Sequence, residues 1–189
     1  MKVIKENTNY KLEVNKSIFY TDLVKVYSKD EVINELNKIK EKYKDATHYC
    51  YAYIIDDLKK SSDDGEPGGT AGVPIMESLN NKELNYILCV VTRYFGGIKL
   101  GAGGLVRAYR KATIDAINNS SLLDLVDGYE IKLEVNYNEQ KDLEYLIKDN
   151  YSKQYTDNVT YIIKCDEDIK KILEAKYKII EINKIKIER

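Results

Sequence analysis

The stretch that decides the fold is Tyr86-Ile87-Leu88-Cys89-Val90-Val91-Thr92-Arg93-Tyr94-Phe95-Gly96-Gly97-Ile98-Lys99-Leu100-Gly101-Ala102-Gly103-Gly104. It opens with a continuous apolar run, which is typical of a central strand buried on both faces. A loop with five glycines follows, and beyond it apolar residues recur with helical spacing. The stretch therefore predicts, in order, a strand over 86–91, a glycine-rich loop and a helix over 103–119.

Backbone freedom is concentrated around this stretch. Nine of the ten glycines and both prolines lie between Gly65 and Gly104. Glycine tolerates positive φ and lets other groups approach the main chain, whereas proline fixes φ and removes a hydrogen-bond donor. The first part of the region is the acidic loop Ser61-Ser62-Asp63-Asp64-Gly65-Glu66-Pro67-Gly68-Gly69. Because backbone shape matters most in these two loops, we expect the functional site there.

The second loop has the features of an anion site. In strand–loop–helix units, ligands bind beyond the carboxyl end of the strand, and amides at the helix start attract anions. From residue 93 to residue 111 the chain has five basic residues and no acidic one. The residues expected to contact an anion are Arg93, Lys99, Arg107, Arg110 and Lys111, with the backbone at Gly101, Gly103 and Gly104. The alternative is that the glycines serve only a tight turn, since Ala102-Gly103 replaces the Lys-Ser/Thr of a P-loop.

The acidic loop offers carboxylates without a complete metal-binding pattern. From Asp56 to Glu66 there are five acidic residues against two lysines. Asp63, Asp64 and Glu66 are candidate cleft partners of the basic segment, as general bases or metal ligands, although their spacing is not that of an EF-hand. The alternative is a solvated turn in which Asp63 or Asp64 pairs with Arg93 or Lys99. We assign no catalytic residue, no metal and no cofactor.

His48 is the only histidine and a fourth candidate cleft partner. It precedes Cys50 by two residues on a predicted strand, so both side chains face the same side. A cysteine nucleophile with a histidine base is one interpretation. The other is a structural or cleft-lining pair, because no third group that would orient the histidine is evident. Two ligands are also too few for a zinc site.

Composition excludes several classes of protein. The chain is 43% hydrophobic and 32% charged, which is typical of a globular domain, and its net charge of −1 gives no overall attraction to nucleic acid or anionic lipid. Three cysteines, an odd number without a C-x-x-C pair, argue against a disulfide framework and indicate a reducing compartment. No apolar run approaches the length of a membrane span or of a signal peptide. We therefore expect a cytoplasmic protein that does not bind membranes.

The remaining sequence predicts an α+β chain of two domains. Before the decisive stretch, periodicity and the capping box Ser28-Lys29-Asp30-Glu31 predict strands over 9–14, 17–26 and 47–55 and helices over 29–44 and 71–80. The pattern of predicted strands and helices changes after Asp127-Gly128, so we expect domains over 1–127 and 128–189. The second domain has strands over 129–136, 151–156, 159–165 and 178–187 and helices over 139–148 and 166–177. This βαββαβ order is the ferredoxin-like pattern.

The motifs within 45–53, 62–74 and 91–109 resemble the IMPACT family, in its bacterial YigZ-like branch. They include Asp45-Ala46-Thr47-His48-Tyr49-Cys50-Tyr51, Asp63-Asp64-Gly65-Glu66-Pro67 and Thr92-Arg93-Tyr94-Phe95-Gly96-Gly97. The resemblance implies an N-terminal α/β domain like the second domain of ribosomal protein S5 and domain IV of elongation factor G, followed by the ferredoxin-like domain. Three residues depart from the usual pattern: Gly68 replaces a serine, Tyr49 a short polar amide, and Ile18 a basic residue.

Three hypotheses of function follow. Eukaryotic relatives dampen translational control through an extra N-terminal module that is not present in this sequence, so the resemblance implies a translational setting but not that activity. The first hypothesis is a cytoplasmic, non-enzymatic protein that binds phosphate groups of RNA, with RNA or a ribosome-associated component as partner. The second is an enzyme for a small phosphorylated or carboxylated substrate held by Arg93 and Lys99. The third is a protein-interaction module whose partner is a translation factor or a regulator protein. The oligomeric state is not predicted.

Overall fold

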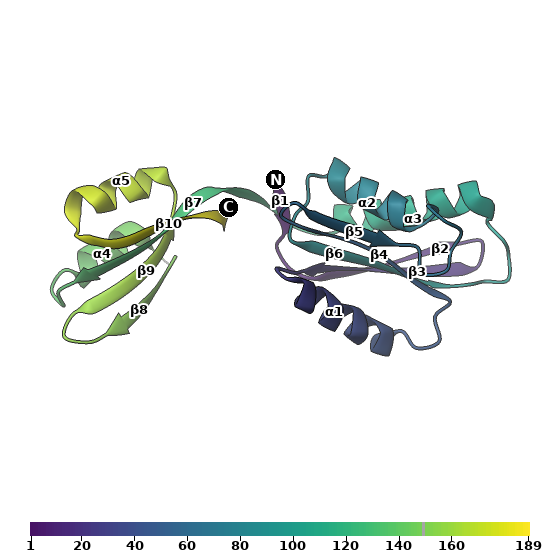
Figure 1. Ribbon diagram of the computed structural model, residues 1–189, viewed down its shortest axis with the longest axis horizontal. Helices are drawn as coiled ribbons and strands as arrows, with labels where there is room; N and C mark the ends of the chain where they lie inside the picture. The colour runs from purple at the N-terminus through teal and green to yellow at the C-terminus, as the bar shows by residue number, and fades with distance from the viewer. Residues whose placement is uncertain (149) are drawn as a thin grey trace. The chain divides into compact units, whose positions relative to one another are not determined.

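The computed structural model describes residues 1–148 and 150–189 of an α+β protein (Figure 1). The chain divides into two compact units, Met1–Asp124 and Leu125–Arg189. None of the helices formed by these residues is long and apolar enough to cross a membrane.

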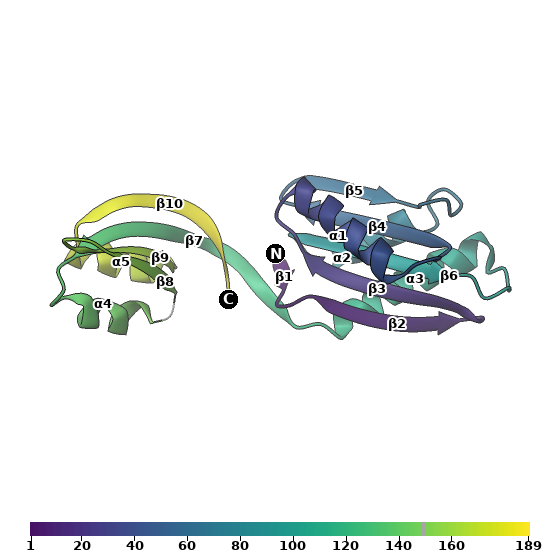
Figure 2. The same ribbon diagram turned by 90° about the horizontal axis from the view of Figure 1, so that it is seen from below.

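The N-terminal unit contains a five-stranded sheet of order β2-β3-β6-β4-β5, in which every neighbouring pair is antiparallel. The elements are β1 (Lys2–Ile4), β2 (Thr8–Val14), β3 (Ser17–Lys25), α1 (Lys29–Lys42), β4 (His48–Ile55), β5 (Leu58–Ser62), α2 (Gly72–Asn81), β6 (Ile87–Tyr94) and α3 (Gly101–Asn118). The helix α1 covers one face of the sheet, and α2 and α3 cover the other (Figures 1 and 2).

The central position of β6 confirms the reading of the apolar run. Seven of its eight residues, from Ile87 to Arg93, are buried. Alternate residues such as Cys89 and Val91 pack under α2 and α3, whereas Leu88 and Val90 pack under α1. The run is continuous because helices cover both faces, although both neighbouring strands are antiparallel.

Local signals place the helices of this unit. The Ser28 hydroxyl accepts a hydrogen bond from the Glu31 amide at 3.2 Å and so caps α1 as the capping box predicts. In α2, Pro74 lies in the first turn, where its missing amide costs no helical hydrogen bond. The helix α3 begins at Gly101, two residues before the predicted start, because the last glycines of the loop already belong to its first turn.

Two strands lie outside the sequence prediction. β1 is three residues long and pairs with Leu122–Asp124, which lie far along the chain. β5 is an exposed edge strand that carries Lys59 and Lys60, so it lacks the alternation that identifies a half-buried strand. Lysines on an edge strand also discourage pairing with another sheet.

The second unit is a four-stranded antiparallel sheet of order β10-β7-β9-β8. Its elements are β7 (Leu122–Val135), α4 (Gln140–Ile147), β8 (Tyr151–Tyr155), β9 (Val159–Cys165), α5 (Glu167–Lys176) and β10 (Ile179–Glu188). The strand β7 belongs to this unit from Leu125 onward. Both helices contribute to one core, with Leu143 and Leu173 packed against Ile131, Leu133 and Tyr161. Order and topology are ferredoxin-like.

Asp127-Gly128 lies inside β7 and not at a break in the secondary structure. A Cβ at Gly128 would come within 2.8 Å of an Ile187 methyl carbon and 2.9 Å of the Cys165 carbonyl oxygen. This glycine therefore permits close packing within the sheet, whereas the sequence predicted a domain boundary beside it.

Candidate functional site

The glycine-rich loop between β6 and α3 is packed against the hairpin that joins β2 and β3. Asn15 and Lys16 form this tight hairpin with φ angles of 47° and 65°. A Cβ at Gly96 would lie 2.0 Å from the Lys16 carbonyl carbon, so only glycine fits there. The Ser17 hydroxyl accepts a hydrogen bond from the Gly96 amide at 3.2 Å. The loop is therefore held in place at its base.

The start of α3 carries no compensating negative charge. Leu100 occupies the N-cap position without a side-chain hydrogen bond to the helix, and the first turn has no acidic residue. The first amides of a helix lack partners within the helix and have a partial positive charge. Gly101, Gly103 and Gly104, whose amides the sequence predicts as anion contacts, lie in the first turn of this helix.

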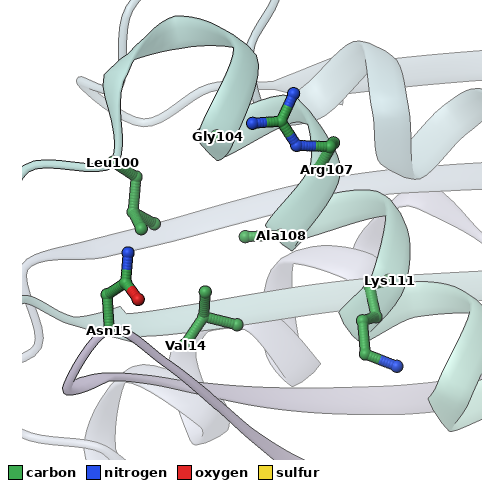
Figure 3. Close-up of a pocket in the computed structure, with 7 residues that line it drawn as sticks. All are labelled: Val14, Asn15, Leu100, Gly104, Arg107, Ala108 and Lys111. Atoms are coloured by element: carbon green, nitrogen blue, oxygen red, sulfur yellow. The ribbon is translucent and has the colours of Figure 1, made fainter.

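Two cations stand beside this helix start. The Arg107 guanidinium turns back along the first turn of α3, so a Cβ at Gly103 would be 3.5 Å from Arg107 Nη1 (Figure 3). Lys99 immediately precedes the N-cap residue Leu100. Within residues 1–148 and 150–189, neither Lys99 nor Arg107 forms an ion pair.

A small cavity of about 190 Å³ adjoins these residues. Figure 3 shows its lining, which joins the β2–β3 hairpin to α3: Val14, Asn15, Leu100, Gly104, Arg107, Ala108 and Lys111. Val14, Leu100 and Ala108 give it apolar surface, Asn15 adds an amide, and Arg107 and Lys111 come from successive turns of α3. The cavity therefore combines cationic, polar and apolar lining.

The other two basic residues of α3 are already paired. Arg110 Nη2 lies 2.5 Å from a Glu77 carboxylate oxygen of α2, and Lys111 Nζ lies 2.9 Å from the Asp115 carboxylate. The hydrogen bond with Asp115 raises the pKa of Lys111 above its ordinary value. The two cations are 44% and 60% exposed, and ion pairs at the surface contribute little to stability.

Arg93 differs from the expectation that it meets an anion at the surface. Its side chain is 6% exposed, and its Nη1 lies 2.6 Å from Glu66 Oε1, which also accepts a hydrogen bond from the Tyr109 hydroxyl at 2.8 Å. The guanidinium is flanked by the rings of Phe19 and Phe95, at 5.6 and 5.4 Å from their centroids. Successive residues of β6 point to opposite faces of the sheet, and Arg93 lies on the face that α1 does not cover. Its side chain therefore faces the interior and supports the loop from within.

The acidic loop is held together by its own carboxylates. Asp63 accepts hydrogen bonds from the amides of Gly69, Ala71 and Gly72 at 2.8–2.9 Å. Burial alone would raise the pKa of Asp63, but these three amides outweigh it and lower the pKa below its ordinary value. Asp64 accepts a hydrogen bond from the Tyr49 amide at 2.7 Å. Neither aspartate pairs with Arg93 or Lys99, because Glu66 occupies the guanidinium.

His48 and Cys50 do not form a nucleophile–base pair. The Cys50 thiol bonds to the Asp63 carbonyl oxygen at 2.9 Å and approaches the Tyr109 hydroxyl at 3.3 Å. Burial raises the pKa of the thiol to about 12. His48 Nδ1 lies 2.8 Å from the Asp64 carbonyl oxygen, and Nε2 lies 3.8 Å from Glu66. Both residues therefore belong to the network that joins the acidic loop to β6.

The β2–β3 hairpin is not among the residues that the sequence predicts for the site. Val14 and Asn15 line the cavity, and Ser17 anchors the loop. Their only local signal is the tight turn between two alternating strands. Its contact with Gly96, nearly eighty residues later in the chain, depends on the tertiary fold.

Comparisons with known proteins agree with this architecture. Residues 15–117 match the Impact N-terminal domain. IMPACT family member YvyE of Bacillus subtilis is 37% identical over 169 residues, covering 84% of this chain and 78% of that protein. IMPACT family member YigZ of Escherichia coli is 34% identical over 140 residues, covering 71% of this chain and 69% of that protein. A crystal structure of a hypothetical protein aligns over 100% of this chain and 97% of its own, with a TM-score of 0.64 and 26% identity. The chain is a member of the IMPACT family.

Proposed function

We propose that this chain is a cytoplasmic, non-enzymatic protein that binds phosphate groups of RNA in connection with translation or its regulation. Its partner is RNA or a ribosome-associated component. The observation that carries the proposal is an uncapped helix start beside Lys99 and Arg107, two cations that have no ion-pair partner among the residues that the structure describes.

The electrostatics favour a phosphate over other ligands. Lys99 and Arg107 supply full positive charges, and the amides of Gly101, Gly103 and Gly104 add hydrogen-bond donors with a partial positive charge. Arg110 and Lys111 extend the positive strip along α3 after exchange of their exposed carboxylate partners. A strip of cations along one helix matches the repeating phosphates of a nucleic acid.

Two further observations support a role in translation and a cytoplasmic location. The family resemblance connects the fold with translation factors and a ribosomal protein. All three cysteines are free and buried, which fits a reducing compartment such as the cytoplasm.

The enzyme hypothesis loses one of its two anion-holding groups. It needs Arg93 and Lys99 to hold the substrate while Asp64 or Glu66 moves protons. Arg93 and Glu66 instead bind each other, with side chains only 6% and 3% exposed. A buried pair of this kind leaves neither charge for a substrate.

The proposal is tested by measuring affinity for a labelled RNA across salt concentrations. Affinity is expected to fall steeply with salt, and Lys99→Ala with Arg107→Ala is expected to reduce the slope of log K against log salt by about 0.7 for each cation removed. The matched control is Lys29→Ala with Lys38→Ala, which removes two exposed charges from α1 on the opposite face of the sheet. Affinity that ignores salt, or that survives the first double substitution, would refute the proposal.

A further inference from the structure

The loop between β6 and α3 presents two large apolar side chains to solvent. Phe95 is 46% exposed and Ile98 is 44% exposed, and they flank Gly96-Gly97. Scattered exposed apolar residues are ordinary on a protein surface. Here they share a six-residue loop with Lys99, which has no carboxylate partner among the described residues.

Two contacts hold Phe95 in place. Its amide donates a hydrogen bond to the Thr47 hydroxyl at 3.0 Å. The Arg93 guanidinium lies 5.4 Å from the centroid of its ring, and the same guanidinium is bound to Glu66. The pair of Arg93 and Glu66 therefore supports an exposed aromatic ring.

The base of the loop is equally constrained. Gly96 fits against the Lys16 backbone, where a Cβ has no space, and its amide is bonded to Ser17. A ring on a rigid loop loses little conformational entropy when a flat partner stacks on it. Such a ring is suited to binding a planar group.

We infer that the site takes single-stranded RNA, with an unpaired base stacked on Phe95 and the adjoining phosphates on Lys99, Arg107 and the first amides of α3. This inference rests on the proposed function and specifies its substrate. Aromatic side chains beside cations are the common arrangement for unpaired nucleotides, since every base has a face that stacks. A duplex keeps its bases stacked inside and offers none to Phe95.

Charge complementarity selects this occupant over an apolar protein surface. Lys99 follows Ile98 directly, and no acidic residue occurs from Arg93 to Lys111. A purely apolar partner would desolvate Lys99 without a compensating charge. A single strand satisfies both features, because its bases and phosphates are exposed together.

The test compares an unstructured RNA with a duplex of equal phosphate number, using the full chain. Phe95→Ala is expected to weaken binding of the single strand roughly tenfold and to leave the weaker binding of the duplex unchanged. Tyr145→Ala is the matched control, because Tyr145 is 89% exposed and lies on α4 of the other unit. Circular dichroism and urea unfolding show whether each variant is folded.

A second variant reports on stacking directly. The chain has no tryptophan, so Phe95→Trp introduces a single tryptophan at the proposed contact, whose fluorescence can be excited apart from that of the tyrosines. We expect this variant to keep its affinity and its fluorescence to be quenched by single-stranded RNA but not by inorganic polyphosphate. If polyphosphate quenches it equally, or RNA does not quench it, base stacking is refuted.

Failure of this inference is distinguishable from failure of the proposed function. Unchanged single-strand affinity in Phe95→Ala, together with loss of affinity in Lys99→Ala with Arg107→Ala, overturns the stacking contact alone. Equal affinity of the native protein for both RNAs would likewise overturn the stacking contact alone. If neither variant loses affinity, both proposals are overturned.

Discussion

Arg93 Nη1 lies 2.6 Å from Glu66 Oε1, and neither side chain is more than 6% exposed. The pair joins the end of β6 to the acidic loop and carries the Phe95 ring on its outer side. The charged residues at the centre of the family's motifs thus hold the site together, and the cations available to a ligand lie further along the chain.

Removal of the Glu66 charge should therefore be costly. Glu66→Gln leaves Arg93 buried without a counter-charge, and loss of one partner of a buried pair costs about 3–5 kcal/mol. Urea unfolding at neutral pH measures the change. Glu77→Gln is the control, because it removes an exposed partner of Arg110 and should cost no more than about 1 kcal/mol. Equal effects of the two substitutions would contradict the structural role of the Glu66 pair.

Gly96→Ala should destabilise the N-terminal unit. The new methyl group would lie 2.0 Å from the Lys16 carbonyl carbon, so the loop must separate from the β2–β3 hairpin. We expect a loss of about 2–3 kcal/mol in the free energy of unfolding. Gly68→Ala serves as the control, because open space surrounds that position. An unchanged unfolding midpoint for Gly96→Ala would show that the loop does not rest on the hairpin.

Asp63 should contribute stability that depends on pH. The folded protein favours its carboxylate form, because three amides lower the pKa of Asp63 below the unfolded value of about 4. The stabilisation is therefore complete above the unfolded pKa and is lost as the pH falls through the folded pKa. Asp63→Asn should be less stable than the native protein at pH 7, and the difference should shrink in acid. Urea unfolding midpoints of both proteins, at pH 7 and in acid, check this. A difference in stability between the two proteins that grows in acid would refute it.

The three thiols should react slowly in the folded protein. Burial raises the pKa of Cys50 and of Cys89 to about 12 and that of Cys165 to about 11. A thiol reagent at mildly alkaline pH should therefore label none of them rapidly, and unfolding in urea should release all three. Rapid labelling of Cys50 in the native state would revive the cysteine nucleophile that the structure argues against.

Much of the fold could be predicted because its signals are local. The apolar run in β6 and the capping box before α1 are properties of a few consecutive residues, and both appear in the structure. β5 carried no such signal, since its lysines lie on an exposed edge. The pair of Lys111 and Asp115 follows from helical spacing and was open to prediction.

The site was less predictable because its partners are distant in sequence. Arg93 at the end of a strand reads as a ligand contact, and only the fold brings Glu66, 27 residues earlier, against it. Likewise, Glu77 neutralises Arg110 from another helix. The exposure of Phe95 depends on how its loop is packed. The partners of Arg93 and Arg110 therefore required the structure.

The amides at the start of α3 provide the most direct test of the central claim. Titration of the ¹⁵N-labelled protein with a short single-stranded RNA should shift the amide resonances of Gly101, Gly103 and Gly104 in a saturable manner. Lys99→Ala with Arg107→Ala should remove these shifts, because the cations hold the phosphate against the helix. Unmoved glycine resonances, with shifts confined to Leu125–Arg189, would contradict the account.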